Sequence, residues 1–408
     1  MSDQQRSPAL AKMTVAITGA NGFIGARAVD MLASLDEPPR VRLLTRRKLR
    51  GGRDCAIVKL DDRASVKAAL DGCDAVIHCA FDFNDMPFNR RAALVLGEEC
   101  AAIGARLVHV STAAVHEPFP DGDLDEETIP PSGGSEYKHV KRAIENELLG
   151  LAGKAGLEVV ILQPAVVYGP FGRAWTDSPV RELLTGTVVL PEDGLGLCNA
   201  VYVDDVCQAV IASLTAPLAS GERILVSGPA PVTWKAFYGA YQDMLHLDAL
   251  RPEPAAGQGE ARSEAPTEAG SEAPSVAVSE ERGGTSSNGV IPSNATRLKT
   301  LVSKFVGGQA MARMNLLANF SLSLVLRRKI HGARGAKLAL FRSRCHIRID
   351  KARRLLAYQP RFDLATGMQS TTPYIVRSYG RLARIRGQRP SARSDPRGPE
   401  REAGSRQA

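Results

Sequence analysis

Met13–Ala26 reads MTVAITGANGFIGA and governs the architecture of the chain. It predicts a buried strand over Thr14–Thr18, then a turn with the spacing Gly19-x-x-Gly22-x-x-Gly25, then a helix. Such glycines let the chain leave the strand sharply, approach a pyrophosphate and pack the helix close to the strand. The free N–H groups and the positive end of the helix then hold phosphates. The pattern favours dinucleotide binding over a glycine-rich turn without a ligand.

Strand and helix patterns alternate after this turn. Helices are predicted over Phe23–Leu35, Ala64–Leu70, Arg90–Ile103 and Glu136–Leu149, and strands over Val41–Leu44, Ala56–Lys59, Ala75–His78, Leu107–Val110 and Val159–Leu162. This alternation predicts an α/β fold with a doubly wound parallel sheet. Ligands of such sheets bind at the carboxyl ends of the strands.

The residues that follow the second predicted strand bear on the cofactor. Thr45-Arg46-Arg47-Lys48 stands where the adenosine ribose is bound in a dinucleotide fold. An acidic residue there binds the 2′-hydroxyl of NAD, whereas an arginine accommodates the 2′-phosphate of NADP. Arg46 and Arg47 therefore favour NADP over NAD, and a solvated basic loop is the alternative.

A tyrosine and a lysine four residues apart provide an acid/base pair. Tyr137 and Lys141 lie on one face of the helix predicted from Glu136, and Thr112 follows the strand Leu107–Val110. A nearby ammonium favours the phenolate, so Lys141 is expected to lower the pKa of Tyr137. The pair gains specificity from Thr112 at a strand end of the same predicted sheet.

Six motifs resemble those of the extended short-chain dehydrogenase/reductase family, in its NAD(P)-dependent epimerase/dehydratase group. They are TGANGFIG (Thr18–Gly25), DAVIHCA (Asp74–Ala80), VSTAAVHE (Val110–Glu117), YKHVK (Tyr137–Lys141), QPAVVYGP (Gln163–Pro170) and NAVYVDDV (Asn199–Val206). Ile349–Met368 is similar to the family's closing element. The resemblance covers about residues 13–245 and 346–376. It implies a Rossmann-type doubly wound parallel sheet with a smaller C-terminal substrate-binding lobe.

The resemblance implies a role for each matching residue. Tyr137 is expected to be the general acid/base, with Lys141 bound to the nicotinamide ribose and Thr112, ahead of its neighbour Ser111, orienting the substrate oxygen. Asp61 is expected to meet the adenine. The cofactor-binding residues expected in this way are Gly19, Asn21, Gly22, Phe23, Ile24, Gly25, Arg46, Arg47, Asp61, Ala80, Tyr137, Lys141 and Pro164.

Three departures from the family pattern limit the activity. Ala113 and Ala114 replace the Asp-Glu pair of the dehydratases, which argues against 4,6-dehydration. Cys198 stands where the family has an arginine that clamps a nucleotide-sugar pyrophosphate, and a thiol does not suit phosphate. His116, in place of a family tyrosine, is a candidate substrate contact, although a solvated loop histidine is the more common case.

The charge is unevenly distributed along the 408 residues. Residues 1–250 carry 24 Lys and Arg against 32 Asp and Glu, whereas residues 296–354 carry 15 against one. The predicted catalytic part is therefore acidic, and the net charge of +8 is no argument for nucleic-acid binding. The basic run Arg327–Arg354 allows three readings, which are a solvated face of packed helices, a lid over substrate phosphates, or a contact with an anionic membrane or a protein.

Domain limits follow from composition and the family pattern. The predicted parts are an N-terminal tail (1–12), an NAD(P)-binding Rossmann domain (13–170, with core strands to about 210), a substrate-binding lobe (171–250 and 296–376), a disordered insertion (251–295) and a disordered basic tail (377–408). A helix is predicted over Arg297–Leu326, and Met314–Arg328 is its candidate membrane contact. Arg342 and Arg344 are candidate ligands of a substrate phosphate.

The leading hypothesis is a cytoplasmic NAD(P)-dependent epimerase or reductase acting on a nucleotide sugar. A reductase of a non-nucleotide carbonyl substrate and a catalytically silent NADP-binding regulatory protein are the alternatives. Seven scattered cysteines and a polar N-terminus indicate a reducing compartment without a signal peptide. No metal and no nucleic acid are expected, while a homodimer and attachment to the inner membrane face through 296–354 remain open.

Overall fold

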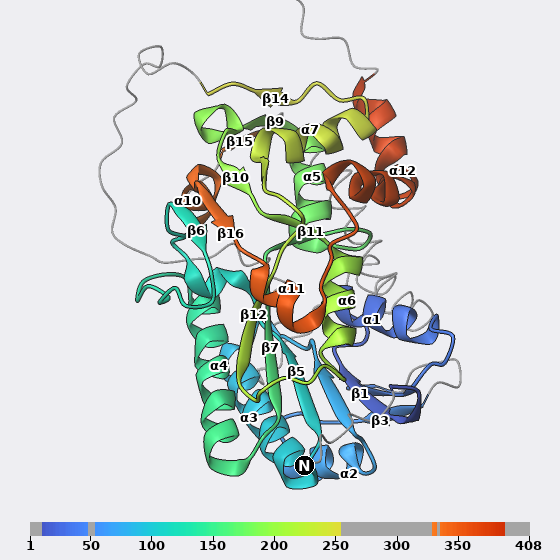
Figure 1. Cartoon of the computed structure of the whole chain (residues 1–408). Helices are drawn as coiled ribbons and strands as arrows, with labels where there is room; N and C mark the ends of the chain where they lie inside the picture. The colour runs from blue at the N-terminus through green and yellow to red at the C-terminus, as the bar shows by residue number, and fades with distance from the viewer. Residues whose placement is uncertain (1–9, 48–53, 254–328, 333–334, 388–408) are drawn as a thin grey trace, which may run out of the picture.

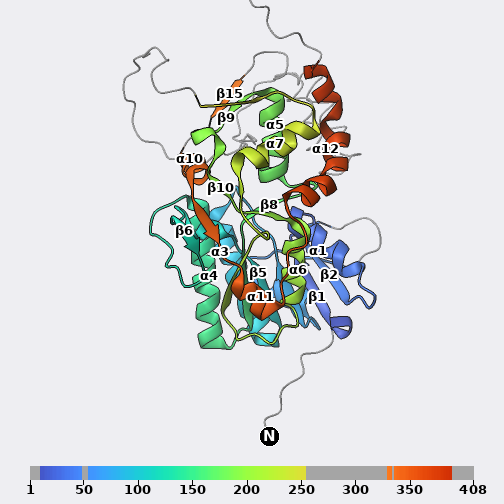
Figure 2. The ribbon, with the colours of Figure 1, turned by 45° about the horizontal axis from the view of Figure 1, so that its top comes forward.

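The computed structural model describes residues 10–47, 54–253, 329–332 and 335–387. Figure 1 shows a large parallel sheet with flanking helices, and a smaller lobe that carries α5, α7 and α12 above it. Figure 2 shows the same two parts from another side. Within the described residues, no helix is long and apolar enough to cross a membrane.

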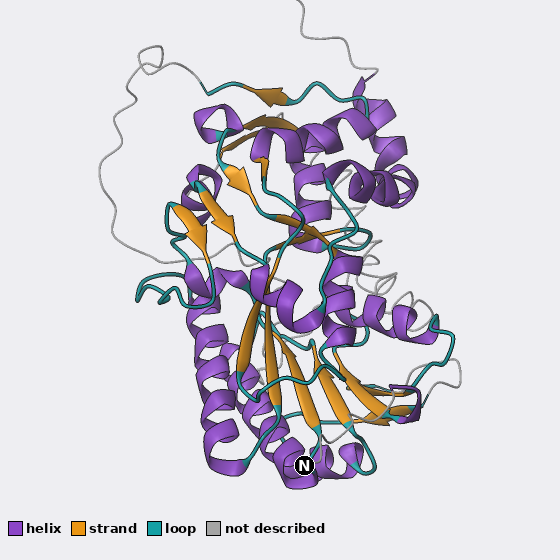
Figure 3. Cartoon of the chain, viewed as in Figure 1, coloured by secondary structure: helices purple, strands orange, loops and turns teal. Residues whose placement is uncertain are grey.

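The large sheet is parallel throughout and has seven strands. In spatial order they are β12 (Glu222–Val226), β7 (Val159–Pro164), β5 (Arg106–Val110), β4 (Ala75–His78), β1 (Thr14–Thr18), β2 (Arg40–Thr45) and β3 (Cys55–Ile57). The register pairs Thr18 with His78 and with Leu44. All the strands therefore end at one edge, as Figure 3 shows in orange. The predicted fold class is confirmed.

Helices cover both faces of this sheet. One face carries α2 (Arg63–Leu70), α3 (Met86–Ile103) and α4 (Glu136–Ala155). The other carries α1 (Phe23–Ala33), α6 (Val203–Ala212) and α11 (Asp350–Leu356). The strands between them are buried on both sides, which explains their nearly uninterrupted apolar sequences.

Capping residues fix where several helices begin and end. The side chains of Asp62, Asp85 and Ser135 accept hydrogen bonds from the first-turn N–H groups of α2, α3 and α4. Gly104 and Gly156 end α3 and α4 in the left-handed conformation. Asp85 explains why α3 begins four residues before the predicted Arg90.

The smaller lobe is built around a cluster of aromatic side chains. Its elements are η3 (Arg173–Asp177), α5 (Ser178–Thr185), β9 (Gly186–Val189), η4 (Pro191–Gly194), β10 (Leu197–Cys198), β13 (Val232–Thr233), α7 (Trp234–Met244), β14 (Leu250–Arg251), β15 (Lys329–Gly332), α10 (Gly335–Arg342) and α12 (Leu364–Gly387). Trp234 is fully buried and lies 4.2 Å, ring centroid to ring centroid, from Phe341 of α10. Phe341 of α10 and the apolar side chains of α12 therefore complete the core begun by α5 and α7.

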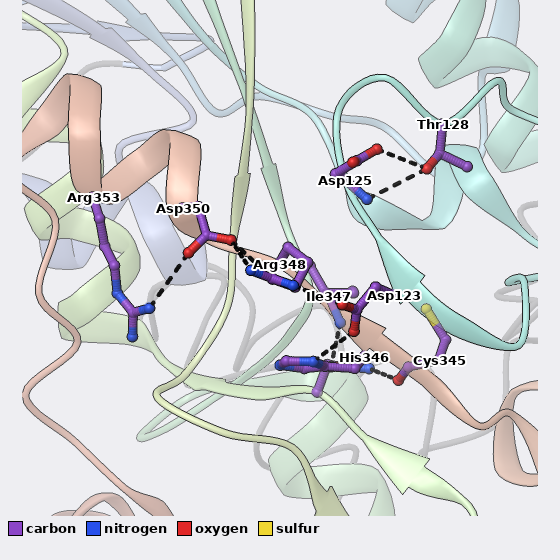
Figure 4. Close-up of polar contacts among 10 residues, drawn as sticks. Asp123, Asp125, Thr128, Cys345, His346, Ile347, Arg348, Asp350 and Arg353 are labelled. Carbon is purple, nitrogen blue, oxygen red and sulfur yellow. Dashed lines mark hydrogen bonds and ion pairs between the residues drawn. The ribbon is translucent and has the colours of Figure 1, made fainter.

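Short elements join the lobe to the large sheet. They are η2 (Ala113–His116), the parallel pair β8 (Val166–Tyr168) and β11 (Ala200–Tyr202), and the parallel pair β6 (Gly122–Leu124) and β16 (Cys345–Ile347). The short helix η1 (Leu10–Lys12) lies directly before β1 and packs on the core of the large sheet. In the last pair, Asp123 contacts His346 and Arg348, and Arg348 also pairs with Asp350 (Figure 4). Cys345–Ile347 is thus attached to the loop that precedes α4.

Basic residues of the late segment are paired with acids of the earlier chain. Lys337 lies 2.7 Å from a carboxylate oxygen of Glu182, and Lys351 lies 2.7 Å from one of Glu222. Among residues 335–354 this pairing supports the reading as packed, charged elements. The predicted helix Arg297–Leu326 and the membrane candidate Met314–Arg328 lie outside the described residues.

Three predicted boundaries are wrong. The sheet contains a seventh strand, β12, in a region assigned to the substrate-binding lobe. Helix α12 continues to Gly387, so a disordered tail does not begin at 377. Helix α4 ends at Ala155 rather than Leu149, because Gly150 and Gly153 lie in open space on the helix and do not break it.

Candidate active site

The glycine turn after β1 forms a tight backbone cradle. Gly19 has φ +67°, and a Cβ added there would lie 2.7 Å from the backbone nitrogen of Ala80. A Cβ on Gly25 would lie 2.3 Å from the carbonyl oxygen of Gly19. The start of α1, at Phe23 and Ile24, has no side-chain cap, and Asn21 and Gly22 are exposed beside it. This cradle fits the pyrophosphate of a dinucleotide.

The residues predicted for the adenosine end lie beyond β2 and β3. Arg46 is 82% exposed, and its guanidinium lies 3.6 Å from the carboxylate of Asp82. Arg47 is also exposed, and its carbonyl oxygen accepts a hydrogen bond from the Thr45 hydroxyl. Oδ1 of Asp61 is buried and has no hydrogen-bond partner among the described residues, with Lys59 Nζ 3.9 Å away. An unpaired acceptor there fits the exocyclic amine of an adenine.

Thr112, Tyr137 and Lys141 converge at the end of β5. The Thr112 side chain hydrogen-bonds to Tyr137 and also accepts from the backbone N–H of Ala114 at 3.1 Å. Lys141 is buried one turn further along α4 and donates to the carbonyl oxygen of Val110 at 3.0 Å. The ammonium thus joins α4 to β5 and brings the phenol beside Thr112.

Burial dominates the electrostatics of this trio. It raises the pKa of Tyr137 to about 12, an effect that the hydrogen bond with Thr112 opposes and the charge of Glu117 increases. It lowers the pKa of Lys141 to about 8, opposed by Cys79 and Glu145. The Tyr137 pKa therefore lies above its ordinary value, opposite in direction to the expected lowering, because burial dominates. At neutral pH Tyr137 carries its proton, as a proton donor to a carbonyl oxygen must.

A buried carboxylate that the sequence did not single out supports the trio. Glu145 follows Lys141 by one turn of α4 and accepts hydrogen bonds from Ser111, Gln163 and Arg223. Burial raises its pKa, and these three donors oppose that shift. Its position on α4, two turns after Tyr137, was the one sequence feature that could have indicated it. Its partners, from β7, β12 and the end of β5, were not deducible from spacing.

The four candidate substrate residues are engaged within the fold. Ser111 donates to Glu145, and the buried His116 lies 3.3 Å from the Gln163 side-chain oxygen. Arg342 and Arg344 both pair with Glu192 of η4, at 3.7 Å and 2.8 Å. The structure thus brings Ser111 close to the Thr112 site, and places the two arginines in the smaller lobe.

The residues that stand in place of the family's arginine and Asp-Glu pair are buried or apolar. Cys198 is fully buried in the aromatic core of the smaller lobe, and Ala113 is buried in η2. Pro164 ends β7, and Ala80 donates its N–H to the Thr18 hydroxyl at 3.2 Å. In the described ranges, no group of three or more histidines, cysteines or acids is arranged to hold a metal ion.

Two phenylalanines lie beside Tyr137 that the sequence analysis did not predict as site residues. The ring centroids of Phe81 and Phe83 lie 5.2 Å and 5.6 Å from that of Tyr137. The Lys141 ammonium lies 4.6 Å from the Phe81 ring centroid. The sequence does contain a signal for them. Phe81 and Phe83 stand two residues apart in the loop that follows β4, at the edge of the sheet where ligands bind.

Comparison with known proteins identifies the family and supports the fold. The model of the NAD dependent epimerase/dehydratase family matches residues 15–227. Cinnamoyl-CoA reductase 1 of Arabidopsis thaliana is 28% identical over 243 residues, which cover 52% of this chain and 70% of that protein. UDP-glucose 4-epimerase of Vibrio cholerae is 24% identical over 237 residues, with coverage of 52% and 70%.

A solved structure extends the comparison to the smaller lobe. UDP-glucose 4-epimerase of Thermotoga maritima, with UDP-glucose, superposes with a TM-score of 0.61 at 18% identity, covering 90% of this chain and 99% of that one. At this identity the likeness establishes the fold alone. With the family match over more than half of its length, the chain belongs to the NAD-dependent epimerase/dehydratase family and is an NAD(P)-dependent enzyme of the extended short-chain dehydrogenase/reductase type.

Proposed function

We propose that the chain transfers a hydride between a nicotinamide cofactor and a carbinol or carbonyl carbon, with Tyr137 as general acid/base. The convergence of Thr112, Tyr137 and Lys141 at the strand edge that carries the glycine cradle supports this proposal. A catalytically silent regulatory protein would have no need of this trio.

In the reduction direction the residues divide the work as follows. The bound nicotinamide supplies the hydride. Tyr137 donates its proton to the carbonyl oxygen, while the Thr112 hydroxyl orients that oxygen by a hydrogen bond. The positive charge of Lys141 stabilises the phenolate that remains, and Glu145 balances that charge from the next turn of α4. Tyr137→Phe should therefore lower kcat by roughly 100- to 10,000-fold, with cofactor binding largely retained through the glycine cradle.

We infer that NADP is preferred over NAD. Arg46 and Arg47 are exposed beyond β2 and present two guanidinium groups suited to a phosphate. Arg46→Ala should weaken NADPH binding, measured by calorimetry, and leave NADH binding unchanged. Equal affinities of the wild-type chain for the two cofactors would contradict the preference.

Net reduction of a non-nucleotide carbonyl is the activity that we favour. The buried Cys198 offers no cationic clamp for a pyrophosphate, and Arg342 and Arg344 are paired with Glu192. Several relatives by sequence bear the names of reductases, including a ketoreductase of Stigmatella aurantiaca. Epimerisation of a nucleotide sugar is the second candidate, supported by the fold shared with UDP-sugar epimerases.

A substrate screen separates the two candidates. Purified chain with NADPH is offered aromatic and aliphatic aldehydes and ketones. Purified chain with NAD⁺ or NADP⁺ is separately offered UDP-sugars, because epimerisation begins with removal of a hydride from the sugar. Carbonyl reduction consumes NADPH absorbance, whereas epimerisation leaves absorbance constant and changes the sugar configuration by NMR. Conversion of UDP-sugars alone would contradict the favoured activity, and conversion independent of Tyr137 would contradict the mechanism.

Two expectations about assembly stay predictions. A homodimer is tested by sedimentation, and contact of 296–354 with an anionic membrane by liposome flotation at low and high salt. Absence of salt-sensitive binding to anionic vesicles would remove the peripheral location at the inner membrane face.

A further inference from the structure

An exposed phenylalanine is stacked on the proposed catalytic tyrosine. The rings of Phe83 and Tyr137 are 5.6 Å apart at an interplanar angle of 24°, and Phe83 remains 69% exposed. Phe81 meets both of these rings edge-on, at 5.1 Å from Phe83 and 5.2 Å from Tyr137. A continuous aromatic wall therefore runs from Lys141 to solvent beside the reacting hydroxyl.

The backbone that carries this wall is held in place. The side chain of Asn89, buried in α3, accepts from the N–H of Asp82 at 2.8 Å and donates to the carbonyl oxygen of Asp82 at 2.7 Å. The Asp82 carboxylate accepts from Asn84 N–H at 3.0 Å and lies 3.6 Å from the Arg46 guanidinium. Phe81 and Phe83 flank this clamped residue, so the wall is preorganised and costs little ordering when a ligand binds.

The chemistry of the wall selects among substrates. Phenylalanine rings offer apolar contact and stacking but no hydrogen bonds, so sugar hydroxyls lying against them would lose water without replacement. A flat aromatic or conjugated group loses no hydrogen bonds there and gains stacking. An exposed apolar side chain of this size next to a catalytic group is typical of a ligand-binding surface.

We propose that Phe83, together with Phe81, is the specificity-determining wall that stacks the aromatic or conjugated part of a carbonyl substrate beside Tyr137. This inference rests on the proposed function and names the substrate class for it. It predicts that the carbonyl carbon is attached directly to the stacked group, because the wall begins at the Tyr137 ring.

Matched aldehydes test the wall. Benzaldehyde and cyclohexanecarbaldehyde are compared as substrates by kcat/KM with NADPH, in the wild type and in Phe83→Ala and Phe83→Leu. Both variants should lower the aromatic-to-saturated ratio, by roughly 5-fold, because Leu restores apolar area but not stacking. Ile57→Ala removes another exposed apolar side chain, on β3, and should leave the ratio unchanged. An unchanged ratio in both Phe83 variants would overturn the proposal. A wild-type kcat/KM for epimerisation of UDP-glucose, measured with NAD⁺ or NADP⁺, above that for both aldehydes would also overturn it.

Two further readouts separate this inference from the proposed function. If Tyr137→Phe lowers turnover by the predicted factor while both Phe83 variants leave the ratio unchanged, the wall is refuted and the function stands. If Tyr137→Phe turns over at the wild-type rate, the function is refuted. Binding of benzaldehyde, measured by saturation-transfer NMR, then tests the wall. Phe83→Ala should reduce the benzaldehyde signal, and an undiminished signal refutes the wall.

Discussion

At the scale of single residues, the site combines groups that sequence spacing identifies with charges that only burial explains. Tyr137 and Lys141 are recognisable from their spacing, and Thr112 from its place after a strand. Their pKa shifts come from neighbours distant in sequence, so the direction for Tyr137 could not be deduced from Lys141 alone. The placement of Phe83 could not be deduced from local sequence either. It depends on the neighbouring Asp82, whose backbone is held by the Asn89 side chain seven residues later.

Lys141 should destabilise the fold in return for its chemical role. Burial lowers its pKa to about 8, so below that pH the folded chain keeps a buried cation at a cost of about 3 kcal/mol. Lys141→Met removes this cost but also loses the hydrogen bond to Val110. The free energy of unfolding at pH 7 should therefore rise by about 2 kcal/mol. Between pH 8 and the ordinary lysine pKa the unfolded chain binds more protons, so wild-type stability rises with pH and the difference shrinks.

Urea unfolding at pH 7, 9 and 10 measures this difference. Lys154→Met, at an exposed position on the last turn of α4, is the matched control and should change stability little. A Lys141→Met chain less stable than the wild type at pH 7, or a gain that does not narrow at high pH, would contradict the electrostatic assignment.

At the scale of elements, the boundaries that local chemistry defines were predictable. The strands Thr14–Thr18 and Ala75–His78 were predicted to the residue, because buried apolar runs there end at glycine or at the sheet edge. The start of α4 follows from the Ser135 cap. The pairs β6–β16 and β9–β15 join segments more than a hundred residues apart, and no local signal specifies such pairing.

The glycine cradle should not tolerate a methyl group. Gly25→Ala would place Cβ 2.3 Å from the Gly19 carbonyl oxygen, and should destabilise the chain by roughly 1–3 kcal/mol and weaken NADPH binding at least tenfold. Gly153→Ala, in open space on α4, should instead stabilise by about 0.5–1 kcal/mol with normal NADPH binding. Thermal unfolding and calorimetry compare the two. Equal effects of both substitutions would show that the close approach at Gly25 is unimportant.

Arg223 should stabilise the junction of α4 and β12 through Glu145. Arg223→Ala removes a charged donor 3.1 Å from the buried carboxylate, so stability at pH 8 should fall by roughly 2 kcal/mol. Burial already raises the pKa of Glu145, and loss of Arg223 raises it further. Protonation of the carboxyl at low pH avoids an unpaired buried charge, so the loss should be smaller at pH 5. A loss independent of pH would indicate a packing effect instead.

At the scale of the whole molecule, a late segment closes the fold over the earlier one. Buried Tyr358 donates to the Ser227 carbonyl oxygen at 2.8 Å, and buried Asp205 accepts from the N–H groups of Arg361 and Phe362. The acidic earlier chain and the basic segment 335–354 are complementary in charge. The composition alone showed only that the charge is unevenly distributed.

Adjacent aspartates provide a test of this closure. Asp205→Ala leaves two backbone donors without their acceptor, and should cost roughly 2 kcal/mol and expose the chain near residue 361 to limited proteolysis. Asp204→Ala breaks an ion pair with Arg27, which is 42% exposed, and should cost about 1 kcal/mol or less without new cleavage there. Equal losses and identical cleavage patterns would contradict the closing role of Asp205.

Transfer of deuterium from NADPH deuterated at its reactive nicotinamide carbon tests the central claim that Tyr137 supports hydride transfer. With the best carbonyl substrate from the screen, mass spectrometry should find deuterium on the carbinol carbon of the wild-type product. In Tyr137→Phe the rate should fall roughly 1,000-fold, a much larger effect than any loss of NADPH affinity. Deuterium transfer by Tyr137→Phe at the wild-type rate, or no transfer by the wild type to any carbonyl offered, would contradict it.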